Sequence, residues 1–180
     1  MTAVADSELL FPLSYFCRKS GAPLPPCEII EGREVPEPYR SLLVHQGDMT
    51  SRLEEFHGAP MKLRVLHREI EGNAYRREVL LCAQDTGLPV EYGAIEINLD
   101  AFAPELREQI LEGRLPLGGL LNRAGLRYSS EPRAFLKLAP DSVMDAHFEL
   151  DGAHTLYGRC NVLRDVDGRP LARIVEVLRP

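Results

Sequence analysis

The chain has 180 residues, of which 44% are hydrophobic and 27% are charged, and its formal net charge at pH 7 is −6. This length and composition are typical of one globular domain that buries its own core without disulfide or metal support. The acidic balance disfavours a nucleic-acid partner, because proteins that bind nucleic acid usually present a basic face. We therefore expect a single domain over residues 1–180 that does not bind nucleic acid.

The sequence also predicts the cellular location of the protein. Its first residues lack the basic region of a secretory signal, and no apolar run approaches the roughly 20 residues that span a membrane. The cysteines have neither CxxC nor zinc-finger spacing; they are Cys17, Cys27, Cys82 and Cys160. These features predict a cytoplasmic protein without membrane insertion. They leave the oligomeric state open, and a monomer is compatible with them.

The N-terminal part is expected to be an extension of this domain. Residues 7–18 have the spacing of a short amphipathic helix, interrupted by Pro12. Residues 20–38 are rich in proline and glycine and predict an irregular path over the surface. We therefore expect residues 1–36 to form an irregular N-terminal extension.

Two helices are expected next. The first, over residues 38–46, ends at Gly47, a good C-terminal stop. The second begins after Asp48, a favoured N-cap residue, and runs to Gly58. Its apolar stripe is Met49, Leu53 and Phe56, and the last two are expected in the core.

From Met61 onward the hydrophobic period changes to two, which predicts strands. Strands are expected over residues 61–71, 75–83 and 88–98, then helices over 103–112 and 116–125. A strand over 133–138 and a closing hairpin over 157–180 follow. Residues 139–155 give no clear pattern, except that 147–150 could extend an edge. Direct strand-to-strand turns imply an antiparallel sheet. The predicted class is therefore α+β, an antiparallel sheet with helices packed on one face.

Common catalytic and nucleotide-binding motifs are absent from the sequence. It contains no GxxxxGK[ST], GxGxxG, GxSxG or HExxH motif, and its five histidines have no regular metal-ligand spacing. These absences disfavour a metal site, a nucleotide site and a Ser-His-Asp triad.

One carboxylate stands in an apolar row of the last strand. Alternation puts Ala172, Ile174, Glu176 and Leu178 on one face, and a carboxylate there costs free energy unless it is protonated, paired or bound to a ligand. A structural role is the more common explanation for such a residue. The sequence alone does not decide between that role and a functional one.

Arg77 poses the same question on the second strand. If Val79 and Leu81 face the core, Arg77 faces it too. Its guanidinium either pairs structurally with a carboxylate, for which Glu176 is the obvious partner, or grips the carboxylate of a ligand. Spacing leaves the two explanations even.

Four stretches together resemble the chorismate pyruvate-lyase family. They are Gly47-Asp-Met-Thr-Ser-Arg-Leu-Glu54, Arg77-Glu-Val-Leu-Leu-Cys-Ala83, Leu115-Pro-Leu-Gly118 and Gly168-Arg-Pro-Leu-Ala-Arg-Ile-Val-Glu-Val-Leu-Arg-Pro180. Their order and separations agree with the family from about residue 37 to the end. The resemblance implies an antiparallel sheet with helices that enclose a buried ligand cavity (the chorismate lyase-like fold). It also implies ligand contacts at Met49, Arg77, Leu117 and Glu176, with neither cofactor nor metal.

The activity that the resemblance implies is a cofactor-independent elimination that turns chorismate, or a related cyclic carboxylic acid, into 4-hydroxybenzoate and pyruvate. Arg77 would hold the ring carboxylate and Glu176 would act as general acid, while Met49 and Leu117 would be apolar walls. The pathway served, ubiquinone biosynthesis or a secondary metabolite, stays open.

Two alternatives accompany this hypothesis. The same fold serves as the effector-binding domain of bacterial transcription regulators, so a non-catalytic domain that binds an aromatic acid is the first. The second is a related lyase with another substrate. It is suggested by the third strand, where the family often carries Arg or Thr and this chain has Glu91-Tyr-Gly-Ala-Ile-Glu96.

Overall fold

A computed structural model describes residues 3–180 of the protein. In chain order the elements are β1 (Ala3–Val4), α1 (Leu13–Ser20), β2 (Cys27–Ile30), the 3-10 turn η1 (Gly32–Glu34), α2 (Tyr39–Leu43), α3 (Met49–His57), β3 (Met61–Glu71), β4 (Ala74–Ala83), β5 (Pro89–Asn98), η2 (Leu99–Ala101), α4 (Pro104–Glu112), α5 (Leu117–Arg123), β6 (Tyr128–Leu138), α6 (Ser142–His147), β7 (Leu156–Asp165) and β8 (Pro170–Leu178). Within residues 3–180, no helix is long and apolar enough to cross a membrane.

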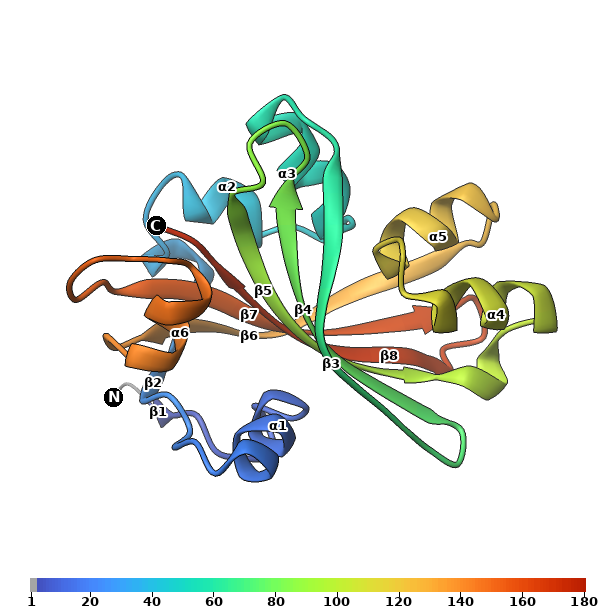
Figure 1. The fold of residues 1–180 in the computed structure, drawn as a ribbon, viewed down its shortest axis with the longest axis horizontal. Helices are drawn as coiled ribbons and strands as arrows, with labels where there is room; N and C mark the ends of the chain where they lie inside the picture. Colours follow the sequence, from blue (N-terminus) through green and yellow to red (C-terminus); the bar gives the residue numbers. More distant parts are fainter. Residues whose placement is uncertain (1–2) are drawn as a thin grey trace.

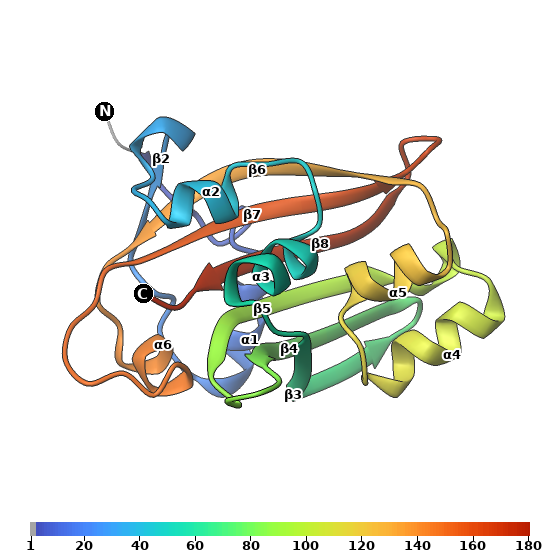
Figure 2. The ribbon, with the colours of Figure 1, turned by 90° about the horizontal axis from the view of Figure 1, so that it is seen from above.

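The strands form one antiparallel sheet in the order β1-β2-β6-β7-β8-β5-β4-β3 (Figure 2). The predicted hairpins β3–β4, β4–β5 and β7–β8 are confirmed. Gly72 and Gly168, at two of their turns, have the positive φ angles of 60° and 79° that glycine adopts readily. Pairing of β5 with β8 sets the closing hairpin beside the central strands. Side chains from distant parts of the sequence therefore share one face of the sheet.

Four helices cover that face. In Figure 1, α2 and α3 lie over one end of the strands and α4 and α5 over the other. The first pair packs around Leu43 and Leu53, and the second around Ile110 and Leu121, all of which are almost fully buried. The α+β class is thus confirmed, and the space between the two helix pairs determines where the site lies.

The opposite face carries helices as well, in addition to those expected on one face. Helices α1 and α6 pack there, on a third core cluster that includes Phe16, Phe148, Leu80 and Val175 (Figure 1). Alternation explains this second core, because Leu80 and Val175 belong to central strands whose two faces are both apolar.

The irregular extension expected over residues 1–36 was wrong, although the short helix expected over residues 7–18 is present in part as α1. The edge extension considered for residues 147–150 was also wrong, because these residues belong to no strand. Residues 3–36 contain β1, α1, β2 and η1, and β2 pairs with β6. The four apolar or charged residues of β2 directly follow two prolines, and they are too few to show a period of their own. Residues 139–155 contain α6, where the Asp141 side chain accepts hydrogen bonds from the backbone amides of Val143 and Met144. A helix of six residues is likewise too short for its hydrophobic period to be recognised.

Helix α3 follows the predicted capping chemistry. The Asp48 side chain accepts a hydrogen bond from the Ser51 amide, and Gly58 ends the helix with φ of 64°. Leu53 is buried as expected, but Phe56 is 53% exposed, so its expected core position was wrong. The helix meets the sheet mainly through its N-terminal half, which leaves its last turn in solvent.

The close approach of β7 to β8 depends on Gly158. A Cβ at this position would clash with the backbone oxygen of Glu176, which cannot move without displacing the strand. We expect Gly158→Ala to lower the free energy of unfolding by about 1–3 kcal/mol, as overpacking usually does. Urea denaturation measures this change. Gly119→Ala is the control, since a Cβ there meets nothing within 4 Å and alanine favours the helix. Equal loss in both variants would contradict the explanation.

Candidate functional site

The covered face of the sheet is a regular grid of side chains. One row across the strands is Arg159, Glu176, Gly93 and Val79, from β7, β8, β5 and β4. The next row, in the direction of α4 and α5, is Asn161, Ile174, Ile95 and Arg77, and Glu91 stands beside Gly93 on the other side. Four ionisable residues and Asn161 therefore share the middle of a face whose other positions in these rows are glycine or apolar.

A cavity lies over this grid. Its walls come from the sheet and from the first turns of α3 and α5, and about 60 Å³ of it is open to the centres of water molecules. One buried water needs roughly 10–15 Å³ by this measure, so the cavity has room for several waters or a small ligand. Gly93 contributes to this space, because a Cβ there would lie 3.2 Å from Val79 Cγ2 and 3.5 Å from Glu91 Oε1.

All four residues proposed from the sequence as ligand contacts line this cavity: Met49, Arg77, Leu117 and Glu176. Met49 and Leu117 are the first residues of α3 and α5, and both are buried. They are apolar and point onto the sheet, so they can wall the cavity. Their contact with a ligand stays a prediction.

Arg77 is a buried cation without a carboxylate partner among residues 3–180. It is 1% exposed, and its hydrogen bonds are two long ones of 3.5 Å to the backbone oxygens of Ile110 and Leu115. Its Nε has no partner within the described chain. The ring of Tyr75, 5.8 Å from the guanidinium carbon, offers weak compensation. Loss of water lowers the pKa of Arg77, but arginine remains charged in proteins.

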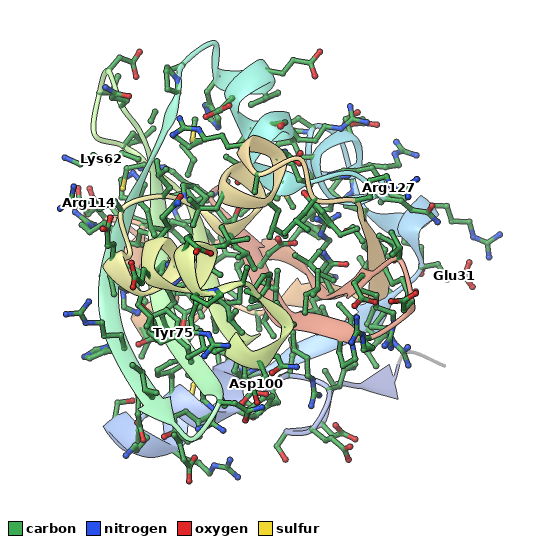
Figure 3. All side chains as sticks on the ribbon, turned by 90° about the vertical axis from the view of Figure 1, so that its right-hand side faces the viewer. Glu31, Lys62, Tyr75, Asp100, Arg114 and Arg127 are labelled. Carbon is green, nitrogen blue, oxygen red and sulfur yellow. The ribbon has the colours of Figure 1, made fainter. Side chains whose placement is uncertain are left out.

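Other arginines near the helices do not share this environment. Figure 3 shows Arg114 and Arg127, which flank α5 in the sequence, at the periphery of the molecule. Arg114 is 81% exposed in its side chain. Water solvates the exposed guanidinium of Arg114, whereas the described chain leaves the buried guanidinium of Arg77 without a full set of hydrogen-bond partners.

Glu176 pairs with Arg159 and not with Arg77. Arg159 is fully buried, its Nε donates to Glu176 Oε2, and one terminal nitrogen, Nη1, donates to the backbone oxygens of Leu43 and His45 at 3.1 and 3.2 Å. The structural pairing considered for Arg77 and Glu176 is therefore absent from the described salt bridges. Glu176 has a cation of its own, and Arg77 is left facing the cavity.

Glu91 is a second buried carboxyl on the cavity wall. It is 4% exposed, and its Oε2 has no hydrogen-bond partner among residues 3–180. Burial and the neighbouring Glu176 carboxylate raise the pKa of Glu91 well above its usual range, although Arg159 opposes this shift. The neutral, protonated form is therefore favoured at Glu91.

A polar wall closes the β6–β7 side of the cavity. Ser130 and Asn161 are buried there and hydrogen-bonded to each other, with the Asn161 amide donating to Ser130 Oγ at 2.9 Å. Tyr128 lies beside them, and burial raises its pKa to about 12. These groups are uncharged at neutral pH and can orient a ligand without changing the charge of the site.

Sequence reasoning missed Arg159 and the role of Glu91 in the site. Arg159 could have been predicted as the partner of Glu176, because it lies opposite Glu176 on the other strand of the closing hairpin. Among residues 3–180, no group of three or more His, Cys, Asp or Glu side chains is arranged to hold a metal ion.

Comparison with known proteins identifies the fold. No protein-family model matches the chain, and no curated protein matches its sequence. Among solved structures, the effector domain of PhnF from Mycobacterium smegmatis is 15% identical with a TM-score of 0.56, over 74% of this chain and 88% of that domain. Whole PhnF gives the same identity and TM-score over 76% of this chain, which spans 65% of its length. The fold is chorismate lyase-like.

A third solved structure has a similar description. The ligand-binding domain of a GntR-family transcriptional regulator from Bordetella bronchiseptica is 13% identical, with a TM-score of 0.49 over 66% of this chain and 85% of that domain. At 15% identity, the likeness to the two PhnF structures extends to the fold and not to activity.

Proposed function

We propose that the protein binds a small carboxylic acid with a single negative charge in the cavity, and that Arg77 holds its carboxylate. The observation that carries this proposal is the buried guanidinium of Arg77, which has no carboxylate partner in the described chain and faces a cavity. An uncompensated buried charge costs several kcal/mol. An anionic ligand supplies the missing bidentate hydrogen bonds.

The charges of the cavity determine how many anionic groups fit. Arg159 is neutralised by Glu176, and a protonated Glu91 adds no charge, which leaves the single positive charge of Arg77 in the buried wall. The acidic residue Asp48 also lines the cavity, but it is only partly buried and is therefore not counted as part of the buried wall. A monocarboxylate matches this balance, whereas a second carboxylate would enter without a cation to pair with it. The fold shared with the effector domain of PhnF supports a binding role.

The second candidate is the elimination expected from the resemblance, with chorismate as substrate. What favours it is the grouping of Met49, Arg77, Leu117 and Glu176 around one cavity. Two features fit it less well. Chorismate carries two carboxylates, and Glu176 would have to leave its ion pair with Arg159 to act as general acid. A proton donor in this reaction would more readily be Glu91.

Calorimetric titration and a pyruvate assay together separate the two functions. We expect 4-hydroxybenzoate to bind with one-to-one stoichiometry, and terephthalate, its dicarboxylate counterpart, to bind at least tenfold more weakly. Incubation with chorismate is expected to release no pyruvate beyond the spontaneous rate. Pyruvate release by the wild type that is lost in Arg77→Ala would favour the lyase. If none of these acids binds, the proposed function is contradicted.

Gly93 gives a further prediction for binding. We expect Gly93→Ala to weaken binding of 4-hydroxybenzoate at least tenfold, because the new methyl group occupies cavity space and presses on Val79 and Glu91. Calorimetric titration measures the change, and thermal unfolding verifies that the fold is kept. In Gly119→Ala, a glycine outside the cavity lining is changed, and binding should be unaffected. Unchanged affinity in Gly93→Ala would place the ligand elsewhere.

A further inference from the structure

Glu91 is buried, and it has no role yet in the proposed binding of a carboxylate at Arg77. Its Oε2 faces no hydrogen-bond partner among residues 3–180, although the residue lines the cavity. A buried polar atom left in this state costs free energy, because it has lost its hydrogen bonds to water. Such a cost is commonly compensated when a ligand supplies the partner, as at other binding sites.

The position of Glu91 relative to Arg77 defines a direction for the ligand. Arg77 is opposite Ile95 on β5, and Glu91 lies four residues before Ile95 with the side-chain-free Gly93 between them. At about 3.3 Å per residue, the Cα atoms of Glu91 and Ile95 are roughly 13 Å apart along the strand. A ligand with its carboxylate on Arg77 therefore extends over Gly93 and presents its other end to Glu91.

We propose that Glu91 acts as a neutral hydrogen-bond donor to the ligand and thereby selects monocarboxylic acids that carry an uncharged oxygen at the end opposite the carboxylate. This inference rests on the proposed binding function. It adds the chemical class of the second group, which can be an ether, carbonyl or hydroxyl oxygen. A second anion at that position would face Glu91 and Glu176 and would be rejected.

The charged and titratable groups around Glu91 agree with a neutral state. From β8 comes Glu176 and from β7 Arg159, and these two form an ion pair with each other. On the other strands and helices the lining groups are Arg77, Asp48 and Tyr128, and burial raises the pKa of Tyr128 to about 12. His45, whose backbone oxygen binds Arg159, is uncharged because burial and the Arg159 charge lower its pKa to about 4. The pKa of Glu91 is raised. The carboxyl group therefore holds its proton at pH below this raised pKa and loses the proton as pH rises through it.

Arg159 is the competing donor at this end of the cavity. Its second terminal nitrogen, Nη2, is buried and has no hydrogen-bond partner in the described chain. This guanidinium stays charged at every accessible pH. A contribution from Arg159 is therefore independent of pH and survives changes at Glu91, so the two donors can be distinguished.

The test compares two ligands of nearly equal shape, 4-methoxybenzoate and 4-ethylbenzoate, which differ by an ether oxygen in place of a methylene. Neither titrates above about pH 5, where both are carboxylates. Dissociation constants are measured calorimetrically for the wild type, Glu91→Gln and Glu91→Leu between about pH 6 and about pH 9. We expect wild type to prefer the methoxy ligand at least tenfold at the low end, and any change as pH rises should be a loss of that preference.

The variants give the deciding comparison. Glu91→Gln keeps a neutral donor, so its preference for 4-methoxybenzoate should remain and no longer depend on pH. Glu91→Leu should bind both ligands without preference. If wild type binds both ligands equally, or if the preference survives in Glu91→Leu at every pH, the role of Glu91 is overturned while the binding function stands. If neither ligand nor 4-hydroxybenzoate binds, the proposed function itself fails.

Discussion

Replacing Arg77 by methionine is expected to abolish binding of 4-hydroxybenzoate and, at the same time, to stabilise the ligand-free protein. Binding falls because removal of a buried charged partner costs about 2–5 kcal/mol, or roughly 30-fold to several thousand-fold in affinity. Stability rises because Arg77 is buried with two 3.5 Å contacts and no ion pair among residues 3–180. Methionine fills a similar volume without a charge. We expect a gain of about 1–3 kcal/mol in the free energy of unfolding.

Titration calorimetry and urea denaturation measure the two effects on the same samples. Arg114→Met is the matched control, because its guanidinium is exposed and should affect neither quantity. A loss of stability in Arg77→Met comparable to the loss of binding energy would contradict the account. It would show that Arg77 supports the fold and does not await a ligand.

Replacing Arg159 by methionine is expected to have the opposite effect on stability. We expect a loss of about 3–5 kcal/mol, because Glu176 would remain buried beside Glu91 without its cation. The backbone oxygens of Leu43 and His45 would also lose their donor, which would loosen the connection between α2 and α3.

A double variant and a neighbouring ion pair make this expectation specific. Arg159→Met combined with Glu176→Leu should recover much of the lost stability, because it removes both charges together. Arg164→Met is the control on the same strand. Its pair with Glu131 is partly exposed, and its loss should cost no more than about 1 kcal/mol. Equal losses of unfolding free energy in Arg159→Met and Arg164→Met would show that the buried ion pair contributes no more to stability than the exposed one.

The strands and most helices could be predicted because their signals are local. Alternation defined β3, β4 and β5, and Asp48 and Gly58 marked the ends of α3. Short elements such as β2 and α6 could not, because they contain too few residues for a period. The covering of the second face was missed for two reasons: α6 is too short to be recognised, and the helix expected over residues 7–18, which overlaps α1, gave no sign of the face on which it packs.

The site was partly readable from the closing hairpin. Arg159 lies eight residues before Asp167, and Glu176 lies eight residues after Gly168, so assuming a two-residue turn at Asp167-Gly168 would pair them. The structure has this pair, although its connection is longer and a bulge near Leu163 restores the register. Applying that count would have assigned Glu176 its partner and left Arg77 free. The neighbourhood of Glu91 could not be read in this way, because the register of β5 against β8 is set by tertiary packing across a long connection.

A crystal structure of the protein with 4-hydroxybenzoate tests the central claim most directly. The ligand is predicted to lie in the cavity over Gly93, with its carboxylate oxygens within hydrogen-bond distance of the Arg77 guanidinium and the Arg159–Glu176 ion pair intact. A ligand bound outside this cavity, or one whose carboxylate points to solvent and leaves Arg77 without a partner, would contradict the account.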